Sequence, residues 1–178
     1  MKRSLRLDDI HDLACRFVPA VAADRRLYES GVGVWWPAHE IGHFLVATAA
    51  ECHEVLFGLE TPTSTEVRYA IIREVAATSI SQRLLRRSGH ADLADEEIGC
   101  TDEDTLACAF ESWCKRAVRR LLHAHKLVRL PTTRCGLEIL LARKARQAET
   151  PTYPSHQAAV VHRRLCLAGL ASSYEVAQ

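Results

Sequence analysis

The chain has 178 residues, of which 48% are hydrophobic and 25% are charged, and its formal net charge is +1. This length and composition are typical of a globular protein with one core, so we expect a single domain over residues 1–178. The small net charge excludes a strong overall attraction to nucleic acid or to a membrane surface, and we expect neither as a partner.

The compartment is indicated by three negative features of the sequence. The longest apolar stretch, residues 31–50, is interrupted by two histidines and a glutamate and does not predict a transmembrane helix. The first nine residues lack the apolar core of a signal peptide. Seven cysteines are scattered without a C-x-x-C pair, which is typical of reduced thiols. We therefore expect a cytoplasmic protein.

The N-terminal part of the chain predicts helices and one strand. Asp8 can cap a first helix, which Pro19 breaks or kinks. A mostly apolar helix follows, with Pro37 in or near its first turn, and runs to about Glu51. Residues 52–60 are rich in β-formers and predict a short strand. Between these two helices, the sequence predicts a further helical piece at residues 20–28 and a turn at residues 30–33.

The C-terminal part predicts further helices around an acidic segment. Apolar residues recur at helical spacing over residues 66–87. Residues 91–104 hold seven acids and no basic residue, which indicates a solvated loop. Thr101 and Asp104 are spaced like a capping box at the start of a helix to about Val128. Two more helices are predicted, at residues 136–146 and 155–169. We expect a mainly α fold of six or seven helices with one or two short strands.

The most informative motif is His39-Glu40-Ile41-Gly42-His43, in the apolar helix. Residues four apart share a helix face, so the two imidazoles can reach one atom. Zn²⁺ binds such nitrogens in roughly tetrahedral sites. Glu40 stands where H-E-x-x-H metalloproteases place the general base. Because burying these groups is costly unless a metal or hydrogen bonds satisfy them, we predict a zinc site here.

The segment from His39 to Ala47 looks like the H-E-A-G-H-A-L-V-A helix of the FtsH-type zinc peptidase domain. Later segments resemble, in the family's order, its edge strand, its G-R-A-A-E helix and its G-A-S-N-D segment, at residues 52–59, 71–77 and 99–104. The resemblance covers roughly residues 25–130. It implies a zincin-like fold, free-standing because no part resembles the ATPase module or membrane anchor, with a C-terminal helical extension over 131–178.

In that family an aspartate of the G-A-S-N-D segment is the third zinc ligand. Asp102 would share a helix face with the apolar residues that follow it and point inward, so we expect it to be the ligand. Asp104 fits better as a helix cap and is the second choice. Glu103 matches the family's spacing from the glycine, but the helix face after it includes Glu111.

A second resemblance offers a different third ligand. Residues 74–85 fit an E-x-x-A-x-x-φ-small-x-x-L-L pattern, φ being apolar, and resemble the ligand helix of the repressor-cleaving metallopeptidases of mobile elements. This resemblance implies Glu74, thirty-one residues beyond His43, as the ligand. The acidic segment 99–104 has a counterpart only in the FtsH-type family, so Asp102 remains the first expectation and Glu74 an alternative.

Both resemblances imply a zinc-dependent endopeptidase, with Glu40 as base and an extended polypeptide as substrate. The strand at 52–59 could bind that substrate by edge pairing. A catalytically silent, zinc-stabilised interaction module stays open as another class. Nucleic-acid binding through residues 115–146 also stays open, because this segment has ten basic residues and one acid. We expect its basic side chains to be solvated.

Overall fold

A computed structural model describes residues 4–18, 21, 33–47 and 64–149. These residues form α-helices and no strand, with one isolated antiparallel bridge between Ser4 and Thr133. The helices are α1 Leu7–Phe17, α4 Trp36–Val46, α5 Ser64–Arg87, α6 Ala91–Gly99, α7 Glu103–Phe110, α8 Ser112–Ala124 and α9 Arg134–Glu149. The expected mainly α class is therefore confirmed. The other predicted segments, at 20–28 apart from Val21, 52–60 and 155–169, lie outside the described residues.

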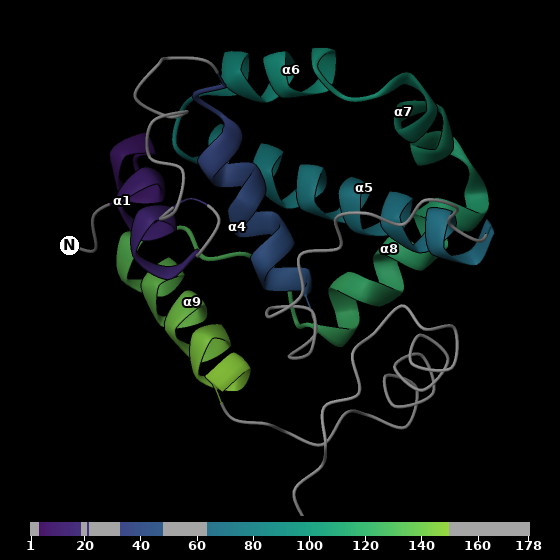
Figure 1. The fold of residues 1–178 in the computed structure, drawn as a ribbon. Coiled ribbons are helices and arrows are strands. Elements are labelled where there is room, and N and C mark those ends of the chain that lie inside the picture. The colour runs from purple at the N-terminus through teal and green to yellow at the C-terminus, as the bar shows by residue number, and fades with distance from the viewer. Residues whose placement is uncertain (1–3, 19–20, 22–32, 48–63, 150–178) are drawn as a thin grey trace, which may run out of the picture.

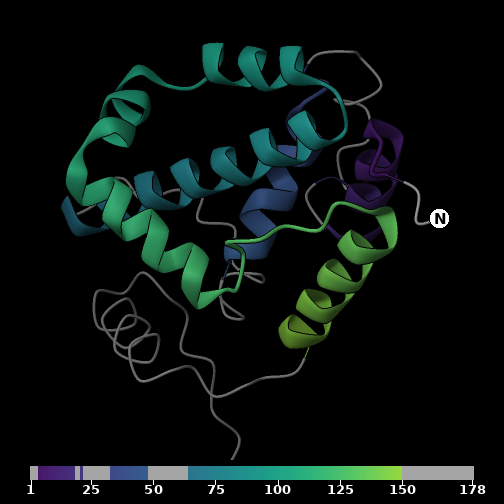
Figure 2. The same cartoon turned by 180° about the vertical axis from the view of Figure 1, so that it is seen from behind.

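Helix α4 lies at the centre of the described fold (Figure 1). It packs against the long helix α5, which lies in front of it when the molecule is seen from behind (Figure 2). Helices α1 and α9 lie together beside α4, and α6, α7 and α8 follow one another around α5 (Figures 1 and 2). One hydrophobic cluster runs through all of these helices except α7.

Helix α4 is buried on nearly every side. Only Trp36, Glu40 and His43 among its residues are half-buried rather than buried, and this spacing puts them on one stripe of the helix. Pro37 occupies the first turn, where its missing N–H is not needed. The helix ends at Val46, short of the predicted Glu51, because the backbone turns extended at the next residue.

The C-terminal end of α4 is closed by a lysine from α9. The ammonium of Lys144 donates a hydrogen bond to the carbonyl of Ala47, the C-cap residue of α4. Lys144 is only 8% exposed, so this is a buried cation at the end of a helix where the macrodipole favours positive charge. Leu141 and Leu137, one and two turns earlier in α9, are fully buried in the core. Helix α9 therefore packs in the same core as α4 and caps its C-terminal end.

A glycine sets the distance between α4 and α5. A Cβ atom at Gly42 would lie 2.5 Å from the carbonyl oxygen of Ala77 and 2.7 Å from its Cα. Backbone atoms cannot swing away from such a contact, so only glycine allows the two helices to approach this closely. Glu74 lies three residues before Ala77 on the same face of α5. The contact at Gly42 therefore brings Glu74 beside the histidines of α4.

We predict that Gly42→Ala destabilises the protein by about 1–3 kcal/mol, the usual range for an overpacked core, because the two helices must separate. Thermal and denaturant unfolding of the metal-free protein would measure the change. Gly99→Ala is the matched control, since a Cβ at Gly99, at the end of α6, meets no atom within 4 Å. Equal stability of the two variants would contradict the close approach at Gly42.

The acidic segment is a helix and not the predicted loop. Helix α5 ends at Arg87, as predicted, and the turn after it contains Gly89 with a positive φ of 90°. Helix α6 begins at Ala91. Within α6 the residues Ala94 and Glu97 are buried, three positions apart, while Asp92, Asp95 and Glu96 are exposed. The acids thus lie mainly on the outer face of an amphipathic helix. Because they are so numerous, the helical spacing of the few apolar residues is hard to recognise in the sequence.

The predicted helix from residue 104 to 128 is two helices. Glu111 has an extended backbone and separates α7 from α8. The buried residues Thr105 of α7 and Cys114 of α8 are nine positions apart, or two and a half helical turns. A straight helix would point one of them to solvent, so the chain breaks to bury both. The break leaves Phe110 69% exposed.

Polar contacts hold the outer helices in place. On α5, Arg83 and Arg87 donate to backbone carbonyls of the α8–α9 connection, at residues 127, 128, 130 and 131. On α9, Arg134 binds the carboxylates of Asp9 and Asp12 on α1. Asp9 also accepts from the backbone N–H of Arg6, which is the N-cap residue in place of the predicted Asp8. None of the described helices is long and apolar enough to cross a membrane.

Candidate metal centre

Three side chains from α4 and α5 converge on one point. Nε2 of His39 lies 2.9 Å from Oε1 of Glu74, and Nε2 of His43 lies 3.1 Å from Oε2 of the same carboxylate. The two Nε2 atoms are 3.0 Å apart. The imidazole rings meet edge to face, with centroids 4.7 Å apart and planes at 76°. The i, i+4 spacing on α4 therefore brings both Nε2 atoms to the carboxylate of α5.

This group could hold a metal ion. One ligand atom from each of His39, His43 and Glu74 lies within 4.8 Å of the others. In a tetrahedral zinc site with bonds of about 2.0–2.1 Å, neighbouring ligand atoms are roughly 3.3 Å apart. The contacts of 2.9–3.1 Å in this group are only a few tenths of an ångström shorter. Small side-chain adjustments would therefore make room for the ion.

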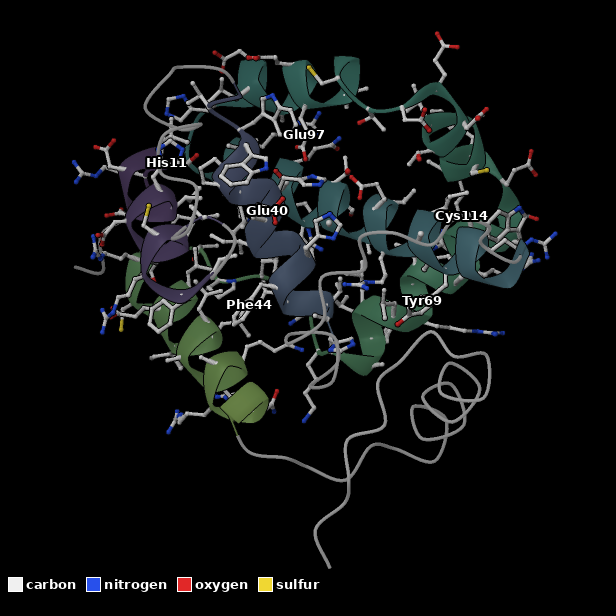
Figure 3. The ribbon with its side chains drawn as sticks, viewed as in Figure 1. His11, Glu40, Phe44, Tyr69, Glu97 and Cys114 are labelled. Atoms are coloured by element: carbon white, nitrogen blue, oxygen red, sulfur yellow. The ribbon has the colours of Figure 1, made fainter. Side chains whose placement is uncertain are left out.

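His39 lies between two carboxylates. It is 8% exposed, and its Nδ1 is 2.9 Å from Oε1 of Glu97, which reaches it from α6 (Figure 3). The indole of Trp35 meets its ring edge to face at a centroid distance of 5.7 Å. Burial by itself lowers the pKa of His39, but the hydrogen bonds and charges of Glu74 and Glu97 outweigh burial and raise this pKa to about 9.

Glu74 is held in its charged form. Burial raises the pKa of its carboxyl, but the hydrogen bonds from His39 and His43 and their charges lower this pKa well below its usual range. The carboxylate is therefore ionised at neutral pH, as a metal ligand must be.

Glu40 follows His39 on α4 and lies beside this group. It is half-buried, on the stripe of α4 that also carries His43 (Figure 3). Among the described residues it forms no hydrogen bond or ion pair. A carboxylate in this position could accept a proton next to the candidate ligands.

The structure does not bring Asp102 to the histidines. Its carboxylate accepts a hydrogen bond from the backbone N–H of Thr105 at 2.9 Å and caps α7. Asp104 and Glu103 are exposed in the first turn of α7. The inward face that was expected after Asp102 includes Phe110, which is exposed, because α7 ends at that residue. Of the predicted third ligands, Glu74 is the one that joins the group.

Glu97 is the residue that sequence reasoning missed, because it was counted as part of a solvated acidic loop. Its side chain is 1% exposed, and the hydrogen bond from His39 links positions 58 residues apart. A signal was present: at helical spacing, Glu97 shares a face with Leu93, Ala94 and Ile98, so it is the acid on the apolar side of α6. A single acid on an apolar face indicates a partner inside the fold.

The arrangement can bind a cation and keep a proton acceptor next to it. Two imidazole nitrogens and one carboxylate could supply three ligands to a metal ion. Comparisons with protein-family models, curated proteins and solved structures found no match to the chain.

Proposed function

We propose that the protein is a zinc-dependent endopeptidase with a zincin-like domain. His39, His43 and Glu74 hold the metal in this proposal, and Glu40 is the general base. The observation that carries the proposal is the convergence of the three ligand groups at 2.9–3.1 Å, with Glu40 next to the first ligand on the same helix. Imidazole nitrogens with a carboxylate oxygen are a ligand set that Zn²⁺ accepts in hydrolytic enzymes.

The side chains divide the chemistry between them. A zinc ion, when bound, would polarise a water molecule and the carbonyl of the peptide bond. Glu40 takes the proton of the attacking water and delivers it to the leaving amine, as a general base and then a general acid. Its half-buried position on α4 suits this role, because it can meet a substrate while staying beside the metal ligands.

The position of Glu74 supports the likeness to the repressor-cleaving metallopeptidases over the likeness to the FtsH-type domain. In the first group the glutamate of the E-x-x-A helix is the ligand, and the matching residue here is the one that contacts both histidines. In the second group the ligand is an aspartate, and here Asp102 serves as a helix cap. The substrate that we propose for either case is an extended polypeptide.

The test compares Glu74→Ala with Asp102→Ala. Wild-type protein should bind about one Zn²⁺ per chain and cleave an unfolded protein such as casein. Glu74→Ala should lose both zinc and cleavage, because two histidines alone hold zinc poorly, whereas Asp102→Ala should keep both. Metal analysis after chelator competition and a casein digest measure the two properties.

Several outcomes would contradict the proposal. Zinc loss in Asp102→Ala but not in Glu74→Ala would reverse the ligand assignment and favour the FtsH-type likeness. Zinc binding by the wild type without cleavage of a broad panel of unfolded proteins would indicate a silent zinc-stabilised module. Full zinc retention in His43→Ala would remove the site as described.

A further inference from the structure

The hydrogen bond between His39 and Glu97 determines which nitrogen of the imidazole keeps its proton when a metal binds the other. A carboxylate has no proton to donate, so Nδ1 of His39 carries the hydrogen in its 2.9 Å contact with Oε1 of Glu97. In a neutral imidazole the lone pair then lies on the other nitrogen, Nε2. Nε2 is the atom that faces His43 and Glu74. Because Nε2 also faces a carboxylate, the metal-free ring carries a proton on each nitrogen. The contact with Glu97 keeps the proton on Nδ1 when a metal displaces the one on Nε2.

The burial of Glu97 has no separate structural explanation. The side chain is 1% exposed, and its second oxygen, Oε2, has no hydrogen-bond partner among the described residues. A buried carboxylate with one unpaired oxygen is costly, and an apolar residue of similar size would stabilise the fold at least as well. The acid is therefore best explained by what it does to His39.

Helix α6 holds Glu97 firmly enough for this task. Ala94, one turn earlier on the same face, is fully buried, and α6 packs along α5. At the C-terminal end, the hydroxyl of Thr101 donates to the carbonyl of Glu97 at 3.0 Å, and so does the backbone N–H of Cys100 at 3.2 Å. The backbone of Glu97 is thus held in place where its side chain meets His39.

We propose that Glu97 is a positioning residue of this site, which locks the ring of His39 so that Nε2 faces the other two ligands. This inference rests on the proposed metal site but assigns a residue outside the ligand set, from a helix that supplies no ligand. Carboxylates in this position orient ligating histidines and raise their basicity. Removing such a partner typically costs 10–100-fold in metal affinity.

The experiment measures zinc affinity by chelator competition in Glu97→Ala, Glu97→Gln and the control Glu96→Ala. Glu96 is the exposed neighbour on the same helix, so its loss removes the same charge without touching His39. We expect Glu97→Ala to bind zinc about 10–100-fold more weakly. Glu97→Gln retains an acceptor oxygen and should recover much of the loss, and Glu96→Ala should bind like wild type.

A second readout separates positioning from general stability. Nitrogen NMR of histidine in the zinc-loaded protein reports which ring nitrogen is protonated, and we expect a proton on Nδ1 of His39 in wild type that becomes exchange-broadened in Glu97→Ala. If Glu97→Ala does not fold, Glu97→Asp replaces it, because the shorter side chain keeps the charge but withdraws the carboxylate from Nδ1.

Different results would contradict the positioning role of Glu97 and the metal site itself. Wild-type zinc affinity in Glu97→Ala, or an unprotonated Nδ1 in the wild type, would overturn the positioning role and leave the proposed metal site intact. A wild-type protein that takes up neither Zn²⁺ nor the spectroscopic probe Co²⁺ would overturn the metal site and the positioning role with it.

Discussion

Replacing Glu40 with glutamine should reduce peptide hydrolysis by about 10²–10⁴-fold, the usual contribution of general acid–base catalysis. The amide keeps the size of the side chain but cannot accept the proton of the attacking water. Glu40 contacts neither histidine nor Glu74 through a hydrogen bond or ion pair among the described residues, so the metal should stay bound. Casein digestion by metal-loaded protein, with the zinc content measured on the same sample, tests both halves of this prediction.

Glu96→Gln is the matched control for this variant, because it makes the same chemical change at an exposed position that touches no ligand. It should leave hydrolysis unchanged. Equal cleavage by wild type and Glu40→Gln would show that the activity belongs to a contaminant or to another site. Loss of zinc in Glu40→Gln would instead show that Glu40 supports the metal directly.

Metal affinity should rise steeply with pH through the neutral range. In the metal-free protein the two carboxylates raise the pKa of His39 to about 9, so the imidazole carries a proton below that pH. Zinc binds the neutral imidazole and must displace this proton. Affinity should therefore fall as the pH decreases below about 9, and the fall should approach about tenfold for each pH unit in the neutral range.

Chelator competition at pH 6, 7 and 8 would measure this slope, with the pH dependence of the chelator itself taken into account. Histidine NMR of the metal-free protein gives an independent check, since the resonances that disappear in His39→Ala should titrate near pH 9. Zinc affinity that does not change between pH 6 and 8 would contradict the doubly hydrogen-bonded state of His39.

The sequence predicts the part of the site that is local. His39 and His43 meet because residues four apart share a helix face, and this depends on no other element. Glu74 could be named only through a family resemblance, because its place beside α4 depends on the approach of two helices at Gly42. The hydrogen bond from His39 to Glu97 spans 58 positions and involves a helix that was not expected. Contacts of this kind follow from packing and not from spacing.

The prediction of helices succeeded where one periodic pattern extended over many residues and failed where two signals competed. Residues 66–87 carry one long apolar pattern, and α5 covers them. In α6 the number of acids concealed a helical period. The break at Glu111 was missed because the apolar residues on both sides each fit a helix, although not the same straight helix. The signal that separates α7 from α8 is a shift in the phase of the apolar helical pattern, and not a change in apolar content.

The lysine at the end of α4 has a consequence for biosynthesis. Lys144 lies 97 residues after the carbonyl that it caps, and the core residues Leu137 and Leu141 come from the same late helix. A chain that leaves the ribosome from its N-terminus therefore presents His39 and His43 long before the segment that closes their helix. Under the proposed endopeptidase function, this order would delay hydrolysis until the nascent molecule itself is no longer an extended substrate.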